Sequence, residues 1–265
     1  MSIQHQIDLA KKYLKYYFKA GNRHDVHSPF VFSLIEDVLN KKADRPAYRP
    51  MENLRGQLLQ SKAVVNVTDL GAGSLTGAGT QRKVSDIARH AAKPEKFGQL
   101  FYRLVQYFQP GSVLELGTSL GMSTAYMASA KPDAKVYTIE GCPNITELAR
   151  TNFALLGLQN VQQFTGNFDE VLPKVLEQMQ APDFVYIDGN HRKEPTLDYF
   201  HQCAAKVQDH SIFIFDDIHW TPGMEEAWKE IQDDERVTLT IDLFFIGLVF
   251  FRKDFKIKQH FTIKY

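Results

Sequence analysis

Three aspartates lie directly after two strand-like runs of the sequence. Asp188 follows the apolar run 184–187, and Asp216 and Asp217 follow the run 212–215. Because the carboxyl ends of neighbouring parallel strands meet at one edge of a sheet, we expect these carboxylates to lie close together. Such carboxylates repel one another unless a cation or shared protons compensate, and oxygen ligands suit Mg²⁺, Ca²⁺ or Mn²⁺. We therefore predict that Asp188, Asp216 and Asp217 bind a hard divalent metal ion. Helix capping would explain one of these aspartates, but not three at one edge.

Two histidines follow the same strand-like runs. His191 comes three residues after Asp188, and His219 comes two residues after Asp217. An imidazole titrates near neutral pH and can therefore act as a general base, with or without a metal ion. A hydrogen-bonded structural role is the alternative for each. His191 and His219 are thus the candidate catalytic residues.

A glycine-containing turn follows an earlier strand-like run. The apolar run 113–116 leads into Gly117 and Gly121, and a helix-forming stretch comes next. This order predicts a buried strand, a tight turn and a helix whose free N–H groups face a ligand. A dinucleotide site would need G-x-G-x-x-G, but Ser119 and Met122 stand where two of its glycines would be. We therefore expect a bound ligand other than a nicotinamide or flavin dinucleotide.

The motif E-x-G-x-x-x-G-x-S, at residues 115–123, resembles the first motif of the class I S-adenosylmethionine-dependent methyltransferases. The segment I-D-G-x-H, at residues 187–191, is similar to the metal-assisted small-molecule O-methyltransferases. The resemblance covers about residues 97–265. It implies an α/β, Rossmann-like sheet of seven strands, mostly parallel with the last strand antiparallel. It also implies methyl transfer from S-adenosylmethionine to a hydroxyl of a small molecule, with a metal ion, Mg²⁺ for example, that orients the hydroxyl and lowers its pKa.

The resemblance also implies a cofactor site at the carboxyl ends of the strands. The glycine turn would wrap the methionine portion, and Glu115 would order that turn or reach the amino group through water. Glu140, at the end of the second strand, would accept hydrogen bonds from the ribose hydroxyls, although an acid there also suits the start of a helix. The residues implied for cofactor binding are Glu115, Gly117, Thr118, Ser119, Gly121, Glu140, Gly166, Asn167, Phe168 and Asp188.

The sequence departs from the family pattern in several places. Asn167 replaces the aspartate of the adenine segment, and Asp217 replaces the asparagine of the Asp-Asn pair found in the catechol- and caffeoyl-type enzymes. Residues 189–191 stand where those enzymes carry a lysine. A competing segment at 69–74 matches D-x-G-x-G, but no strand ending in an acid follows it, so we expect a loop there.

The order of the predicted elements agrees with this interpretation. Strand-like runs at 113–116, 135–139, 161–165, 184–187 and 212–215 alternate with helical stretches, which predicts a parallel sheet covered on both faces. The runs 237–244 and 246–251 are joined so closely that they must pair antiparallel. Helices are predicted at 3–20, 30–40, 51–60, 82–92 and 95–108. We divide the chain into an N-terminal helical extension, 1–97, which covers the site as a lid, and a methyltransferase domain, 98–265.

The amino-acid composition limits which classes of molecule the protein is expected to bind. The chain of 265 residues has 31 basic and 31 acidic side chains, so no global field attracts nucleic acid or an anionic membrane. No apolar run is long enough to span a bilayer, and the two cysteines make no disulfide framework, so we expect a cytoplasmic protein. The expected partner is a small-molecule methyl acceptor, and the oligomeric state stays open. Two rival functions remain, a metal-independent N- or O-methyltransferase with a histidine base and a non-catalytic S-adenosylmethionine-binding module.

Overall fold

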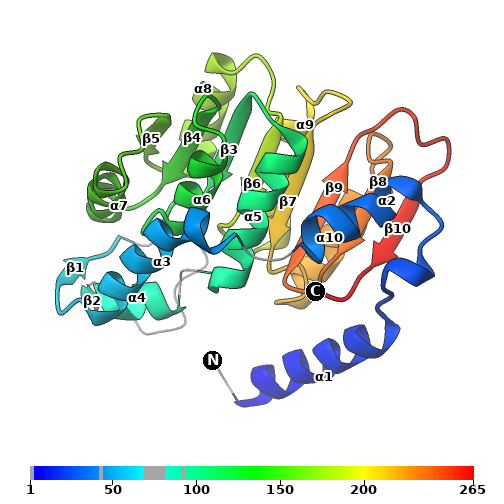
Figure 1. Ribbon diagram of the computed structural model, residues 1–265, viewed down its shortest axis with the longest axis horizontal. Helices are drawn as coiled ribbons and strands as arrows, with labels where there is room; N and C mark the ends of the chain where they lie inside the picture. Colours follow the sequence, from blue (N-terminus) through cyan, green and yellow to red (C-terminus); the bar gives the residue numbers. More distant parts are fainter. Residues whose placement is uncertain (1–2, 42–43, 69–80, 91–92) are drawn as a thin grey trace. The chain divides into compact units, whose positions relative to one another are not determined.

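The structure is a computed structural model that describes residues 3–41, 44–68, 81–90 and 93–265 (Figure 1). The competing segment at 69–74 lies outside the described residues. Two compact units make up the described chain. One comprises residues 3–40 and 180–265, called here the aspartate unit, and the other comprises residues 41, 44–68, 81–90 and 93–179, called the glycine-turn unit. The predicted boundary at residues 97/98 divides the chain differently and stays a prediction.

The glycine-turn unit contains three parallel strands, a short hairpin and six helices. The strands are β1 (Val64–Asn66), β2 (Gln81–Lys83), β3 (Ser112–Leu116), β4 (Lys135–Glu140) and β5 (Val161–Thr165). The helices are α3 (Arg45–Gln60), α4 (Val84–His90), α5 (Glu95–Phe108), α6 (Met122–Ala130), α7 (Pro143–Leu155) and α8 (Phe168–Gln178).

Strands β3, β4 and β5 form a parallel ladder in that order, with β4 in the centre. In β3, Val113, Leu114 and Leu116 have no exposed surface, as expected for a strand covered on both faces. Gly98 of α5 allows α6 to pack closely, because a Cβ there would lie 2.4 Å from the ring of Tyr126. The register brings the ends of β3, β4 and β5 to one edge, where the glycine turn begins.

Gly121 is required by both backbone conformation and packing. Its φ is +78°, and a Cβ there would lie 2.4 Å from Cε1 of Phe153 on α7. We expect Gly121→Ala to lower the free energy of unfolding by about 2–4 kcal/mol, since left-handed strain and overpacking add. Gly157→Ala is the matched control, because Gly157 has φ +68° and open space around it. Urea unfolding should give a loss of only about 1–2 kcal/mol there. Equal losses in the two variants would show that the Phe153 ring moves aside.

The aspartate unit contains five strands and the remaining helices. The strands are β6 (Phe184–Ile187), β7 (Ile212–Asp216), β8 (Leu239–Asp242), β9 (Ile246–Phe250) and β10 (Gln259–Thr262). The helices are α1 (Ile3–Lys19), the 3-10 turn Arg23–Asp25, α2 (Pro29–Leu34), the π-helical turn Ile35–Leu39, α9 (Lys193–Ala204) and α10 (Pro222–Asp233).

The strands of this unit follow the order β10-β8-β9-β7-β6. Strand β6 is parallel to β7, and β9 is antiparallel to both β7 and β8. The predicted α/β class with a mostly parallel sheet is confirmed. The predicted antiparallel pairing of 237–244 with 246–251 is confirmed as β8 and β9. The predicted count of seven strands is wrong, because β10, which is parallel to β8, makes an eighth. With four residues, all at least partly exposed, β10 gives little hydrophobic signal in the sequence.

The N-terminal helices agree with the prediction in part. Ser28 is the N-cap of α2, and its Oγ accepts from the N–H of Val31 at 3.4 Å. Helix α3 begins at Arg45, earlier than predicted, and the predicted helix 82–92 is instead strand β2 followed by α4.

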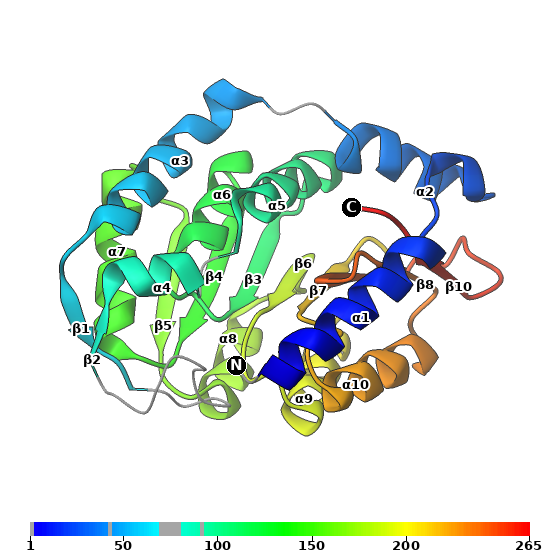
Figure 2. The same cartoon turned by 90° about the horizontal axis from the view of Figure 1, so that it is seen from below.

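Helix α1 packs within its own unit, beside α10 (Figure 2). Lys12 forms a 2.9 Å ion pair with Glu225 of α10, and the Tyr16 hydroxyl donates to the carbonyl of Ile263. Among the described residues, none of the helices combines the length and the apolar character needed to cross a bilayer.

Candidate active site

The turn after β3 is fixed by backbone hydrogen bonds and by three positive φ angles. Gly117 has φ +101°, Ser119 +47° and Gly121 +78°. The N–H of Gly117 donates to the carbonyl of Ile139 at 2.9 Å, and the N–H of Gly121 donates to the carbonyl of Thr118 at 2.8 Å. The turn is therefore anchored to β4 while it directs the chain into α6.

Glu115 is fully buried below this turn and accepts three hydroxyl hydrogen bonds. Ser123 and Thr124 in the first turn of α6 donate to it, and Thr138 of β4 donates at 2.7 Å. Burial raises the pKa of Glu115 to about 7, against the lowering effect of these hydrogen bonds. Two roles were considered for Glu115, and these hydrogen bonds favour the first, which is to order the glycine turn.

Thr118 has only 1% of its surface exposed, and its hydroxyl lies 2.5 Å from that of Thr138. Its side chain therefore belongs to the core below the turn.

Glu140 connects the end of β4 to the glycine turn. One carboxylate oxygen accepts from the N–H of Ser119 at 2.9 Å, and the other accepts from the N–H of Cys142 at 3.0 Å. Since Cys142 is the residue before α7, Glu140 also serves the start of that helix. The carboxylate is thereby fixed at the end of β4, beside the glycine turn.

The predicted adenine segment lies at the end of β5. The N–H of Gly166 donates to the carbonyl of Glu140 at 2.9 Å, which joins this segment to the end of β4. Asn167 is the N-cap of α8, and its Oδ1 accepts from the N–H of Asp169 at 3.2 Å. Phe168, the first residue of α8, is half-buried. The substitution of asparagine for aspartate therefore preserves a helix cap, and an adenine contact by Asn167 stays a prediction.

The second group of predicted residues lies at the ends of β6 and β7, within the aspartate unit. The parallel register pairs Ile187 with Phe215, so Asp188 and Asp216 come next at the same level. Ligand atoms of Asp188, His191 and Asp216 all lie within 4.8 Å of one another. Two carboxylates and an imidazole at this separation can hold one divalent cation.

Neighbouring side chains orient this group, called here the DHD cluster (Asp188, His191 and Asp216). The hydroxyl of Tyr186 donates to Oδ2 of Asp188 at 2.9 Å, and Nε2 of His191 lies 3.5 Å from Oδ1 of the same aspartate. Tyr186 is fully buried, so it supports the cluster from the core. Asp216 is 2% exposed, whereas Asp188 and His191 are half-buried.

Asp217 does not belong to the DHD cluster. Its φ is +51°, and its N–H donates to the carbonyl of Phe245 at 2.7 Å, which turns the chain away after β7. The set of ligand atoms that the structure brings together therefore differs from the predicted all-aspartate set. A nitrogen ligand among oxygens suits Mn²⁺, Fe²⁺ or Zn²⁺ as well as Mg²⁺.

His219 is held between two carboxylates. Its Nε2 lies 2.8 Å from Asp242, its Nδ1 lies 3.1 Å from Glu225, and its ring stacks on Phe244. Burial by itself lowers the pKa of His219, but the hydrogen bonds and charges of Asp242 and Glu225 raise it above its ordinary value. Both ring nitrogens are thus occupied, which favours the structural alternative for His219 over a general base.

This arrangement predicts a pH-dependent contribution to stability. Because the folded pKa of His219 lies above the ordinary value of 6.5, its charge stabilises the fold below pH 6.5, and this is lost as the pH rises through the folded pKa. We expect His219→Gln to lower the free energy of unfolding by about 1–3 kcal/mol at pH 6 and by less at pH 9. The control His210→Gln changes an exposed histidine beside Asp183 and should have little effect. A deficit that grows with pH would contradict this assignment.

Sequence reasoning missed several partners of these residues. It treated His191 as a base only, whereas the structure also brings it within reach of a shared metal ligand set. It did not identify Ser123, Thr124 and Thr138 as the donors to Glu115. Hydroxyl residues in the first helical turn after a strand that carries a buried acid are the signal that could have found them.

Comparisons with known proteins agree with the fold and the position of the glycine turn. Residues 114–218 match the model of a methyltransferase domain family. Catechol O-methyltransferase of Niastella koreensis is 32% identical over 124 residues, which are 46% of this chain and 55% of that protein. The chain thus spans about half the length of the curated relatives that it matches.

Solved structures with the same fold include O-methyltransferases. One from Bacillus cereus, in complex with S-adenosylhomocysteine, has a TM-score of 0.56 at 19% identity and covers 83% of this chain and 97% of that chain. One from Klebsiella pneumoniae has a TM-score of 0.57 at 20% identity, over 81% and 93% of the two chains. The predicted resemblance is therefore confirmed as a methyltransferase domain match over residues 114–218 and as a fold shared with solved O-methyltransferases.

Proposed function

We propose that this protein transfers a methyl group from S-adenosylmethionine to a hydroxyl of a small molecule, with the assistance of a divalent metal ion. The observation that carries the proposal is the DHD cluster, whose ligand atoms lie within 4.8 Å at the ends of β6 and β7. Two carboxylates and an imidazole that converge there favour a catalytic role over cofactor binding alone. The methyltransferase match over residues 114–218 includes both this cluster and the glycine turn.

The residues of the glycine turn fit the proposed cofactor. Glu140 lies at the end of β4, where its carboxylate, held by the N–H groups of Ser119 and Cys142, would accept hydrogen bonds from the ribose hydroxyls. Gly117 and Gly121 have positive φ angles, which allow the chain to turn sharply just before the start of α6. Such a turn lets the backbone of a ligand-binding loop approach its ligand closely.

The DHD cluster fits a divalent metal ion. When bound, S-adenosylmethionine supplies the methyl group, and the metal ion lowers the pKa of the acceptor hydroxyl. Asp188 and Asp216 would hold the ion, with Tyr186 fixing the orientation of Asp188. His191, 3.5 Å from Asp188, would either complete the ligand set or hold the proton released by the acceptor. The second role is the basis of a metal-independent alternative, in which an Asp–His pair acts as the base on an O- or N-nucleophile.

Methyl transfer from isotope-labelled S-adenosylmethionine tests the proposal. Catechol-type acceptors should be tried first, given the name of the Niastella relative, followed by sugars and other hydroxylated small molecules. We expect the label in a methyl ether, identified by mass spectrometry, and a rate that falls when a chelator removes the metal. Label on nitrogen would contradict the hydroxyl acceptor. Binding of S-adenosylhomocysteine with no transfer to any acceptor would favour the non-catalytic module.

A further inference from the structure

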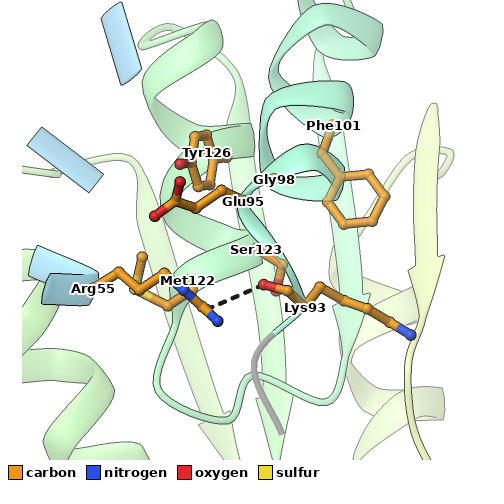
Figure 3. Close-up of a pocket in the computed structure, with 8 residues that line it drawn as sticks. All are labelled: Arg55, Lys93, Glu95, Gly98, Phe101, Met122, Ser123 and Tyr126. Atoms are coloured by element: carbon orange, nitrogen blue, oxygen red, sulfur yellow. Dashed lines mark hydrogen bonds between the residues drawn. The ribbon is translucent and has the colours of Figure 1, made fainter. Parts of the chain in front are cut away.

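The pocket between the starts of α5 and α6 adjoins the glycine turn (Figure 3). Met122 and Ser123, which line it, directly follow that turn in the sequence. The pocket therefore belongs with the cofactor site already proposed. The aspartate unit carries a separate feature that the proposed function does not use, which is the face of α1 that is turned toward solvent.

Helix α1 is apolar on two opposite faces. One face packs within the aspartate unit against Phe244 through three residues, Leu9, Tyr13 and Tyr16. The opposite face carries Ile7, Leu14 and Phe18, which are 43%, 54% and 82% exposed. These three residues, called here the outward face, lie along one side of the helix because seven and four positions separate them. A surface helix usually carries polar residues opposite its buried face, so the outward face indicates a partner.

Lysines lie on both sides of the outward face. On one side, Lys11, Lys15 and Lys19 follow one another at intervals of four residues and so form a row along the helix. All three are exposed, and they form no ion pair within the described part of the chain. On the other side, Nζ of Lys264 lies 4.7 Å from the centroid of the Tyr17 ring. The outward face is therefore an apolar strip with a positively charged border.

This combination is complementary to the surface of a bilayer that contains anionic lipids. Apolar side chains of such a helix enter the boundary between headgroups and acyl chains, while the lysines at its border stay among the headgroups. Each lysine near the surface adds attraction to anionic lipid. The helix has a single acidic residue, Asp8, to oppose it. Because the net charge of the whole chain is zero, this attraction is local to the surface around α1.

Two other partners fit this surface less well. In a symmetric pair of chains the same patch meets itself, so both sets of lysines would gather at one interface and repel one another. Nucleic acid would attract the lysines through its phosphates. It would leave Ile7 and Leu14 without an apolar partner, although they are part of the same surface.

We propose that α1 binds the protein peripherally to a bilayer surface that contains anionic lipids, with Ile7, Leu14 and Phe18 entering the interface. The helix would lie along the surface, with its lysines directed to the headgroups. The inference is independent of the proposed function, because it uses no residue of the glycine turn or of the DHD cluster.

Co-sedimentation of the full chain with lipid vesicles tests the inference. We expect binding to vesicles that mix phosphatidylcholine with phosphatidylserine, and much weaker binding to vesicles of phosphatidylcholine alone. High salt should weaken the binding to the mixed vesicles, because the ions screen the exposed lysines. Absence of binding to the mixed vesicles at low salt would overturn the inference.

Phe18→Gln tests the apolar part of the contact. It should weaken binding to the mixed vesicles at least about tenfold, since the largest exposed side chain of the outward face no longer enters the bilayer. The melting temperature should stay that of the wild type, because Phe18 is 82% exposed in the fold. Leu155→Gln is the matched control, because Leu155 is a 68% exposed residue of α7 and its loss should leave vesicle binding unchanged.

A double variant, Lys11→Gln with Lys15→Gln, tests the charged part. It should weaken binding to the mixed vesicles at least about tenfold, whereas Lys135→Gln with Lys174→Gln, which removes two exposed lysines elsewhere, should have little effect. Vesicle binding that neither Phe18→Gln nor this double variant weakens would place the contact elsewhere and overturn the inference.

The two other partners give different results. A dimer that Phe18→Gln dissociates in analytical ultracentrifugation, without vesicle binding, would assign the outward face to a second copy of the chain. Retention of duplex DNA, without vesicle binding, would assign the lysines to nucleic acid. Either result would overturn the inference and leave the proposed methyl transfer untouched.

Discussion

Replacement of Glu140 by alanine is expected to weaken binding of S-adenosylhomocysteine by about 1.5–3 kcal/mol, the range for hydrogen bonds to a charged group. The reason is the position of the carboxylate, which accepts from the N–H of Ser119 in the glycine turn at 2.9 Å and lies at the end of β4, where we propose that the ribose hydroxyls bind. Calorimetric titration measures the affinity directly. Glu140→Gln, which keeps one acceptor oxygen and the shape of the side chain, should lose less than the alanine variant.

Two controls make the Glu140 result specific. Glu147→Ala removes an exposed carboxylate on the neighbouring helix α7, where it pairs with Arg150, and should leave the affinity unchanged. Asp69→Ala tests the competing segment at 69–74. If Asp69→Ala abolished binding while Glu140→Ala had no effect, the cofactor site would belong to that segment instead.

Asp216→Asn is expected to abolish the response to metal and to lower kcat by at least about 100-fold, because loss of an ion that stabilises developing charge costs several kcal/mol. In the wild type, Mg²⁺ or Mn²⁺ should raise the melting temperature by mass action on the folded state. The variant should show no such rise and should bind S-adenosylhomocysteine almost as well as the wild type. Thermal melts with and without a chelator provide the measurement.

The neighbouring aspartate provides a matched control for Asp216→Asn. Asp217 lies outside the DHD cluster, so Asp217→Asn should keep most of the metal-dependent rise in melting temperature. The sequence alone would have expected equal effects at the two positions. If the enzyme methylated its acceptor at full rate after a chelator had removed the metal ion, the metal proposal would be contradicted. That result would favour a histidine base, and His191→Ala should then lose most of the activity.

Much of the fold could be predicted because the strands of a parallel sheet are short apolar runs between helices. Phe184–Ile187, whose four residues are all buried, is predicted at its observed bounds for this reason. Strand β10 could not be predicted, because Gln259 and His260 are polar and show no alternation of apolar residues. The strand is defined by its pairing with β8. The sequence placed residues 82 and 83 of β2 in a helix, because a strand of three residues is too short to show a period of two.

The candidate site could be predicted at the level of strand ends but not of side-chain geometry. Asp188 and Asp216 could be predicted because each directly follows an apolar strand. The parallel register of β6 and β7 then places the two aspartates at the same level. The direction of Asp217 depends on a single left-handed residue after β7, which the residue type alone does not indicate. The donors that occupy His219 come from α10 and β8, and no local pattern connects those segments.

The attachment of α1 has a consequence for the order of folding. The hydroxyl of Tyr16 in α1 donates to the carbonyl of Ile263, 247 positions along the chain. Gly21, just after the end of α1, forms a parallel β-bridge with Ile263 as well. Contacts between segments so distant in the sequence form slowly, because a very large loop must close first. Helix α1 is therefore expected to dock after the rest of its unit has folded. Substitutions at Tyr16 should accelerate unfolding and leave the refolding rate almost unchanged, as is typical of contacts absent from the transition state.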